Sequence, residues 1–134
     1  MPNQAVINKK AGKMVDLSIV IVNYNVRHLL RKCLDSIYHN TKEISLEITI
    51  VDNNSTDGSV DMVKSEFPEV KLIENCRNLG FAKATNQGLR ENQGRYILLL
   101  NPDTIVLPNA LDGMVDFMDE NPDAGAVGCK LLYP

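Results

Sequence analysis

The segment Arg95-Tyr96-Ile97-Leu98-Leu99-Leu100-Asn101-Pro102-Asp103-Thr104 contains an apolar run that stops at an acidic turn. The run Ile97 to Leu100 predicts a strand buried on both faces, as in a parallel sheet. Pro102 cannot donate to a strand ladder, so the strand ends and Asp103 follows at its carboxyl edge. Ligand sites in parallel sheets lie at that edge. A carboxylate there can hold a divalent cation, and the cation can hold a diphosphate, which favours a nucleotide-linked substrate.

The composition is that of an ordinary globular domain and argues against several classes of protein. The chain has 134 residues, of which 44% are hydrophobic and 23% charged, so it can form one domain with a buried core. Its net charge of −3 offers no basic surface for nucleic acid or an anionic membrane. The three cysteines are widely spaced and match neither a zinc site nor a disulfide framework. Because no signal-peptide pattern is present, we expect a cytoplasmic protein.

Outward from the opening segment, strand and helix patterns alternate at intervals of about 25–30 residues, as in βαβ units. We expect strands at 17–22, 46–51, 70–74 and 97–100, and a final strand at 124–132. Of the helices between them, the first has Asn25 as N-cap, the third has Phe81 on its inward face, and the fourth begins near Pro108. Four acids are expected on the solvated face of the fourth helix: Asp112, Asp116, Asp119 and Glu120. The predicted fold is a three-layer α/β/α sandwich with a mostly parallel sheet, after a flexible tail at residues 1–15.

Three polar clusters follow the predicted strands, at Asn23-Tyr24-Asn25, Asp52 to Asp57, and Asn101 to Asp103. In a parallel sheet these clusters converge on one edge. Tyr24 offers an aromatic face on which a base can stack. Asp52 and Asn53 offer acceptors for a pyrimidine imide N–H or ribose hydroxyls, and Asp103 offers a metal-binding carboxylate. Together these groups meet the needs of a nucleoside diphosphate.

Each cluster also has a purely structural interpretation. Asn23 and Asn25 suit a turn and a helix cap, and Ser55 and Asp57 suit caps better than ligands. Asp103 alone would be read as a turn residue. No nucleophile, base and orienting group form a recognisable triad. The functional hypothesis therefore depends on the convergence of the clusters and not on any single residue.

From Leu17 to about Pro134 the sequence resembles the family 2 glycosyltransferases, which have the GT-A fold with its Rossmann-like nucleotide-binding half. The resemblance lies in four segments: Val22 to Asn25, Val51 to Gly58, Asn101 to Asp103, and Asn78 to Ala82 followed by Asn86-Gln87-Gly88. The Asn-Asn-Ser-Thr-Asp run and the Leu-Asn-Pro-Asp run are similar to the rhamnosyltransferase-like branch of polysaccharide assembly. The implied activity is inverting, metal-assisted transfer from a dTDP- or UDP-sugar to a polysaccharide or lipid-linked acceptor.

The resemblance also implies roles for individual residues. The nucleotide-binding positions would be Val22, Asn23, Tyr24, Asn25, Asp52, Asn53, Gly80 and Asn101. Asp103 matches the final acid of the family's Asp-x-Asp motif and would hold Mg²⁺ or Mn²⁺, whereas Asn101 stands in place of the first acid. No residue matches the catalytic base of the family. We therefore expect residues 16–134 to be the nucleotide-sugar-binding part without the acceptor half, peripheral at the inner face of the membrane in the full-length enzyme.

Other functions stay open on the sequence alone. A nucleotide-binding module without catalysis would carry the same clusters. A phospho-acceptor signalling domain would use Asp52, Thr104 and Lys130, although paired acids are missing after the first strand. A dinucleotide-binding oxidoreductase would need a glycine in the first strand-to-helix turn. Strand edges left open by a missing half could be covered by self-association.

Overall fold

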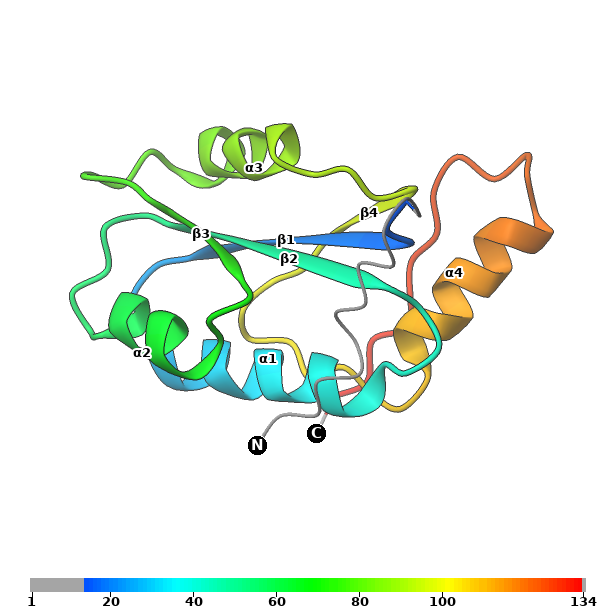
Figure 1. Ribbon diagram of the computed structural model, residues 1–134, viewed down its shortest axis with the longest axis horizontal. Helices are drawn as coiled ribbons and strands as arrows, with labels where there is room; N and C mark the ends of the chain where they lie inside the picture. Colours follow the sequence, from blue (N-terminus) through cyan, green and yellow to red (C-terminus); the bar gives the residue numbers. More distant parts are fainter. Residues whose placement is uncertain (1–13, 134) are drawn as a thin grey trace.

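The computed structural model describes residues 14–133 and contains a sheet of four parallel strands in the order β3-β2-β1-β4. The strands are β1 (Leu17–Asn23), β2 (Leu46–Asp52), β3 (Lys71–Glu74) and β4 (Tyr96–Leu99). The helices are α1 (Arg27–Asn40), α2 (Ser59–Glu66), α3 (Phe81–Arg90) and α4 (Ala110–Glu120). Figure 1 shows α3 on one face of the sheet and α1 and α2 on the other. The predicted α/β/α sandwich is confirmed. Within residues 14–133, no helix has the length and apolar character needed to cross a membrane.

The central strands β1 and β2 are covered on both faces. They pair along their whole length, from Leu17 opposite Leu46 to Asn23 opposite Asp52. Alternate residues of both strands form one core with α1 and α2: Leu17, Ile19, Ile21, Leu46, Ile48, Ile50, Leu30, Leu34 and Met62. On the opposite face, the side chains of Val20 and Val51 lie against Gly88 of α3. Because helices cover both faces, the carboxyl ends of these strands are where polar side chains can meet a ligand.

The prediction that the run Ile97 to Leu100 is buried on both faces is wrong. Leu98 and Leu100 pack against the core, but Ile97 and Leu99 are 49% and 50% exposed. The reason is the position of β4 at the edge of the sheet, where only β1 pairs with it. Helix α3 packs over β1 and β2, so within the described part of the chain no helix covers this face of β4.

The final strand expected near the end of the sequence is also wrong. Residues 124–132 form no strand in the structure, and Leu131 and Leu132 are 79% and 63% exposed. The tail predicted at residues 1–15 lies mostly outside the described residues. The structure describes its last two residues, and the carbonyl oxygen of Val15 accepts a hydrogen bond of 2.9 Å from the amide of Arg95.

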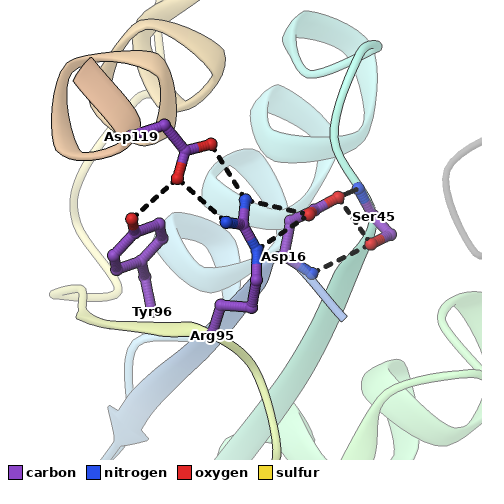
Figure 2. Close-up of polar contacts among 5 residues, drawn as sticks. All are labelled: Asp16, Ser45, Arg95, Tyr96 and Asp119. Carbon is purple, nitrogen blue, oxygen red and sulfur yellow. Dashed lines mark hydrogen bonds and ion pairs between the residues drawn. The ribbon is translucent and has the colours of Figure 1, made fainter. Parts of the chain in front are cut away.

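Helix α4 is tied to the amino end of the sheet by Arg95, which binds two carboxylates (Figure 2). Its guanidinium donates to Asp119 at 2.9 and 3.0 Å and to Asp16 at 3.3 Å. The hydroxyl of Tyr96 donates to Asp119 at 2.7 Å, and these hydrogen bonds from Arg95 and Tyr96 hold the pKa of Asp119 below its usual value. Asp112 of the same helix is buried and accepts a 3.0 Å hydrogen bond from the amide of Glu43. The prediction of a solvated face is therefore wrong for the buried Asp112, whereas Asp119 is exposed as predicted and accepts from Arg95 and Tyr96.

Candidate functional site

The first two polar clusters meet at the carboxyl edge of the sheet, as the sequence predicts for parallel strands, and the third cluster follows β4. Asn23 at the end of β1 lies opposite Asp52 at the end of β2. β4 pairs with the other side of β1, so the turn after Leu99 reaches the same edge. The ends of β1 and β2 are in register and make distant residues neighbours, whereas β4 pairs with β1 only as far as Leu99 opposite Val20.

Asn23 and Asp52 form the buried floor of this edge. The Asn23 side chain is 0% exposed and the Asp52 side chain 2%. The Asn23 amide donates to Asp52 Oδ1 at 2.7 Å and to Ser55 Oγ at 3.1 Å. Asp52 also accepts from the Ser55 amide at 2.8 Å and from the Ser55 hydroxyl at 2.7 Å. Asn23 Oδ1, in contrast, is buried without a hydrogen-bond partner, which leaves one unsatisfied acceptor in the floor.

This geometry disfavours a phospho-acceptor role for Asp52. An acceptor carboxylate must expose an oxygen to attack a phosphoryl group. Both Asp52 oxygens already accept hydrogen bonds, and the residue is 2% exposed. Asp52 therefore connects the end of β1 to the loop after β2 through its hydrogen bonds with Asn23 and Ser55.

Asn25 is not the N-cap of α1, contrary to expectation. The cap position is Val26, and Asn25 has a positive φ of 53°. The Asn25 side chain instead accepts a 2.7 Å hydrogen bond from the amide of Thr56, joining the β1 and β2 loops. Asp57 supplies the missing cap, accepting from the Arg27 amide at 2.7 Å while also accepting from the Ser59 amide at 3.0 Å. The predicted capping role of Asp57 is confirmed, at the start of two helices.

The capping role of Asp57 has an electrostatic consequence. Burial alone would raise the pKa of this carboxyl, but hydrogen bonds from Ser59 and from the Arg27 amide outweigh burial and lower the pKa below its ordinary value. An ionised acid near the amino ends of α1 and α2 also complements their dipoles. Asp57 is thereby an ionised structural group beside the site.

Tyr24 lies just beyond β1 and is 51% exposed, so its ring is free to stack on a ligand. Val22, the residue before Asn23, is half-buried and points with Val20 toward the α3 face of β1. The site edge thus combines one exposed aromatic ring with a buried polar floor.

Asn53 is held by the loop that follows β3. Its side chain is 2% exposed. Its oxygen accepts from the Asn75 side chain at 3.1 Å and from the Leu79 amide at 3.3 Å, and its nitrogen donates to the carbonyl of Gly80 at 3.3 Å. Gly80 has a φ of 79°, which favours glycine at this turn. No local sequence pattern predicts that Asn75, Leu79 and Gly80 contact Asn53, because Asn53 lies more than twenty residues earlier.

The third cluster is more open. Asn101 and Asp103 are exposed, and the Asn101 carbonyl is 3.8 Å from the thiol of Cys33, which donates to it. Burial and, less strongly, the charge of Asp103 raise the pKa of the Cys33 thiol to about 12, so this cysteine is an inert part of the core. Among residues 14–133, no three His, Cys, Asp or Glu side chains gather to hold a metal ion. The donor set fits Mg²⁺ or Mn²⁺ only as an ion shared with a ligand, since one carboxylate with phosphate oxygens and water is a common arrangement.

Comparison with known proteins agrees with this geometry. Residues 18–133 match the pattern of Glycosyl transferase family 2. The chain belongs to this family. It is 37% identical over 111 residues to the poly(ribitol-phosphate) beta-glucosyltransferase of Bacillus spizizenii, a match that covers 78% of this chain and 17% of that protein. It is 37% identical over 90 residues to the glycosyltransferase GlyA of Streptococcus pneumoniae, covering 65% of this chain and 13% of GlyA.

Solved structures of glycosyltransferases share the fold of this family 2 chain. The S. aureus TarS 1–349 structure superposes with a TM-score of 0.72 at 22% identity, covering 80% of this chain and 33% of TarS 1–349. The mannosyltransferase PcManGT of Pyrobaculum calidifontis, in complex with GDP-Man and Mn²⁺, gives a TM-score of 0.70 at 25% identity, with the same coverage of 80% and 33%. The chain thus spans a minor part of each of these proteins.

Proposed function

We propose that residues 16–134 are the nucleotide-sugar-binding part of a GT-A glycosyltransferase domain. The domain would transfer a sugar from a nucleoside diphosphate to a glycan or lipid-linked acceptor. The observation that supports the proposal is the parallel pairing of β4, β1 and β2, since Asp103, Tyr24 and Asn53 each follow the carboxyl end of one of these strands. Support also comes from two structural neighbours, TarS in complex with UDP-GlcNAc and PcManGT in complex with GDP-Man and Mn²⁺.

In this proposal the base and the diphosphate occupy opposite ends of the edge. Tyr24 stacks on the base, with Val22, Asn23, Asn25, Asp52, Asn53 and Gly80 forming the surrounding wall and floor. Asn101 and Asp103 lie at the diphosphate end, where Asp103 would hold Mg²⁺ or Mn²⁺. The cation would neutralise charge that develops on the departing diphosphate. Asn101 in place of an acid leaves one carboxylate, so the affinity for the cation alone should be low and should rise with the nucleotide bound.

The acceptor site and the catalytic base are proposed to lie outside residues 16–134. Two acids of α4 that could be considered for the base are already engaged, since Asp112 is buried and Asp119 is bound by Arg95 and Tyr96 at the opposite end of the sheet. Inverting transfer needs a base beside the acceptor hydroxyl. A nucleotide-binding module without catalysis is therefore the alternative for this chain taken alone.

Finer assignments are also proposals. A dTDP- or UDP-sugar donor and the rhamnosyltransferase-like branch are supported by the two Asn- and Asp-rich runs of the sequence. A cytoplasmic location, peripheral at the inner face of the membrane, is supported by the exposed free thiols of Cys76 and Cys129. Self-association through an open strand edge is supported by the exposed Ile97 and Leu99 of β4.

Calorimetric titration with UDP and dTDP, with and without Mn²⁺ or Mg²⁺, tests the donor site. We expect binding that is tighter with the cation, and we expect Asp103→Ala to remove that dependence. Asp116→Ala is the matched control, because Asp116 is equally exposed but lies on α4. If neither nucleotide binds at millimolar concentration, the proposal for this chain is wrong. If a UDP- or dTDP-sugar binds to the chain and no sugar is released from it, the module is favoured over the transferase.

A further inference from the structure

A chain of three side-chain amides connects α3 to the end of β2. Gln87 of α3 and Asn75, the residue after β3, form a reciprocal pair. The Asn75 nitrogen donates to Gln87 Oε1 at 2.8 Å, and the Gln87 nitrogen donates to Asn75 Oδ1 at 2.9 Å. The Asn75 nitrogen also donates to Asn53 Oδ1 at 3.1 Å. None of the three amides is an exposed residue.

Nearly all hydrogen-bonding positions of these three amides are occupied. An amide nitrogen carries two N–H donors, and both donors of Asn75 are used. An amide oxygen has two acceptor positions, and both positions of Asn53 are used, by Asn75 and by the Leu79 amide. A free acceptor for a base is therefore not present on Asn53 while the loop 75–80 is closed over it. Asn53 serves in this state to hold the loop.

Gln87 closes the α3 end of this amide series, and the backbone of Leu79 and Gly80 fixes the orientation of Asn53 at its other end. An asparagine amide can rotate by half a turn and exchange its oxygen with its nitrogen. The Asn53 oxygen, held by the Leu79 amide, requires the Asn75 nitrogen to face it, and Gln87 completes this arrangement by accepting from and donating to Asn75. In the opposite orientation two oxygens would face each other at Asn53. The backbone supports the same arrangement, since the Asn75 amide donates to the carbonyl of Asp52 at 2.9 Å.

We propose that Gln87 is a positioning residue of the nucleotide site, acting through Asn75 to hold Asn53 and the loop 75–80 at the base end. This inference rests on the proposed function. The inference predicts different effects at the two ends of the site, because contacts that do not involve Gln87 hold the turn with Asp103. The Leu100 amide donates to the Val20 carbonyl at 3.0 Å, and the Thr104 amide donates to the Asn101 carbonyl at 3.2 Å. Loss of Gln87 should therefore affect binding of the base and leave binding of the diphosphate unchanged.

The test is calorimetric titration of Gln87→Leu with UDP and with inorganic pyrophosphate, both in the presence of Mn²⁺. A net hydrogen bond contributes enough for a change of about three- to tenfold in affinity. We expect UDP to bind about three- to tenfold more weakly to Gln87→Leu and pyrophosphate to bind as it does to the unaltered chain. Gln93→Leu is the matched control, since Gln93 is exposed and lies before β4, at the other end of the sheet.

Two results would overturn the inference. Unchanged UDP affinity would mean that Gln87 does not position the base end, and equal weakening of UDP and pyrophosphate would mean a general loss of structure. If the unaltered chain binds no nucleotide, the proposed function is wrong. Hydrogen exchange then tests separately whether Gln87 holds the loop 75–80 through Asn75 and Asn53. In that case the Leu79 amide should exchange at least threefold faster in Gln87→Leu than in Gln93→Leu. Equal exchange would show that the amide chain does not hold the loop.

Discussion

Replacement of Gly88 by Ala would place a methyl group between α3 and the sheet. A Cβ at this position would lie 2.5 Å from Val20 Cγ1, 3.3 Å from Val51 Cγ2 and 3.4 Å from Val20 Cγ2. Val20 is 2% exposed in the central strand β1, and its branched side chain has little rotational freedom. The contact can be relieved only if α3 moves away from the sheet.

Two terms of opposite sign determine the effect on stability. Exchange of glycine for alanine inside a helix is favourable by about 1 kcal/mol, because alanine has less conformational entropy to lose. Overpacking a close contact costs about 1–3 kcal/mol. Gly113 of α4 isolates the first term, since a Cβ there would have no atom within 4 Å. We therefore expect Gly88→Ala to be about 1–3 kcal/mol less stable than Gly113→Ala, which should itself be more stable than the unaltered chain by about 1 kcal/mol.

Urea unfolding of the three proteins measures this difference directly, provided that their m-values agree. Thermal unfolding gives a second measure, with roughly 4 °C expected for each 1 kcal/mol in a domain of this size. If Gly88→Ala stabilises the chain as much as Gly113→Ala does, α3 is not packed against Val20 as described. The layer arrangement on this face of the sheet would then have to be revised.

Two further predictions concern charged groups that hold the fold together. Arg95→Met should lower the free energy of unfolding by about 1 kcal/mol or less, because its ion pairs with Asp16 and Asp119 are partly exposed to solvent. It should leave UDP affinity unchanged, and a loss of affinity larger than that of Arg90→Met would contradict the placement of this cluster at the opposite end of the sheet. Acid should destabilise the chain, since hydrogen bonds lower the pKa of Asp16, Glu47 and Asp57 despite burial, which acts in the opposite direction. A carboxyl group whose pKa is lowered by folding stabilises the folded state. Its contribution is complete at a pH above its pKa in the unfolded chain, about 4, and is lost as the pH falls through its pKa in the folded chain. Urea unfolding at a series of pH values should therefore show a decline below about pH 4, which Asp57→Asn should reduce in slope.

Several features of the site could be predicted from the sequence because they depend on neighbouring residues. The turn at Pro102 ends the strand wherever that strand lies in the sheet, and Asp57 is a good cap by its chemistry alone. The alternation of strands and helices predicts a parallel sheet, and a parallel sheet brings Tyr24, Asn53 and Asp103 to one edge. The same local grounds predict Asn25 as a cap, and this prediction is wrong because Asp57 from a different loop occupies that role.

The sequence by itself therefore determined the fold class, the family and the three clusters, since periodicity and turn chemistry are local properties. Only the tertiary structure decided which groups are free to bind. It joins Asn53 to Asn75 and Gln87, and Asp52 to Asn23 and Ser55, across wide separations in sequence. It also puts β4 at the edge, so that half of an apolar run is exposed. The physical reason is that strand order and hydrogen-bond partners depend on which distant segments pack together, and no local pattern encodes that choice.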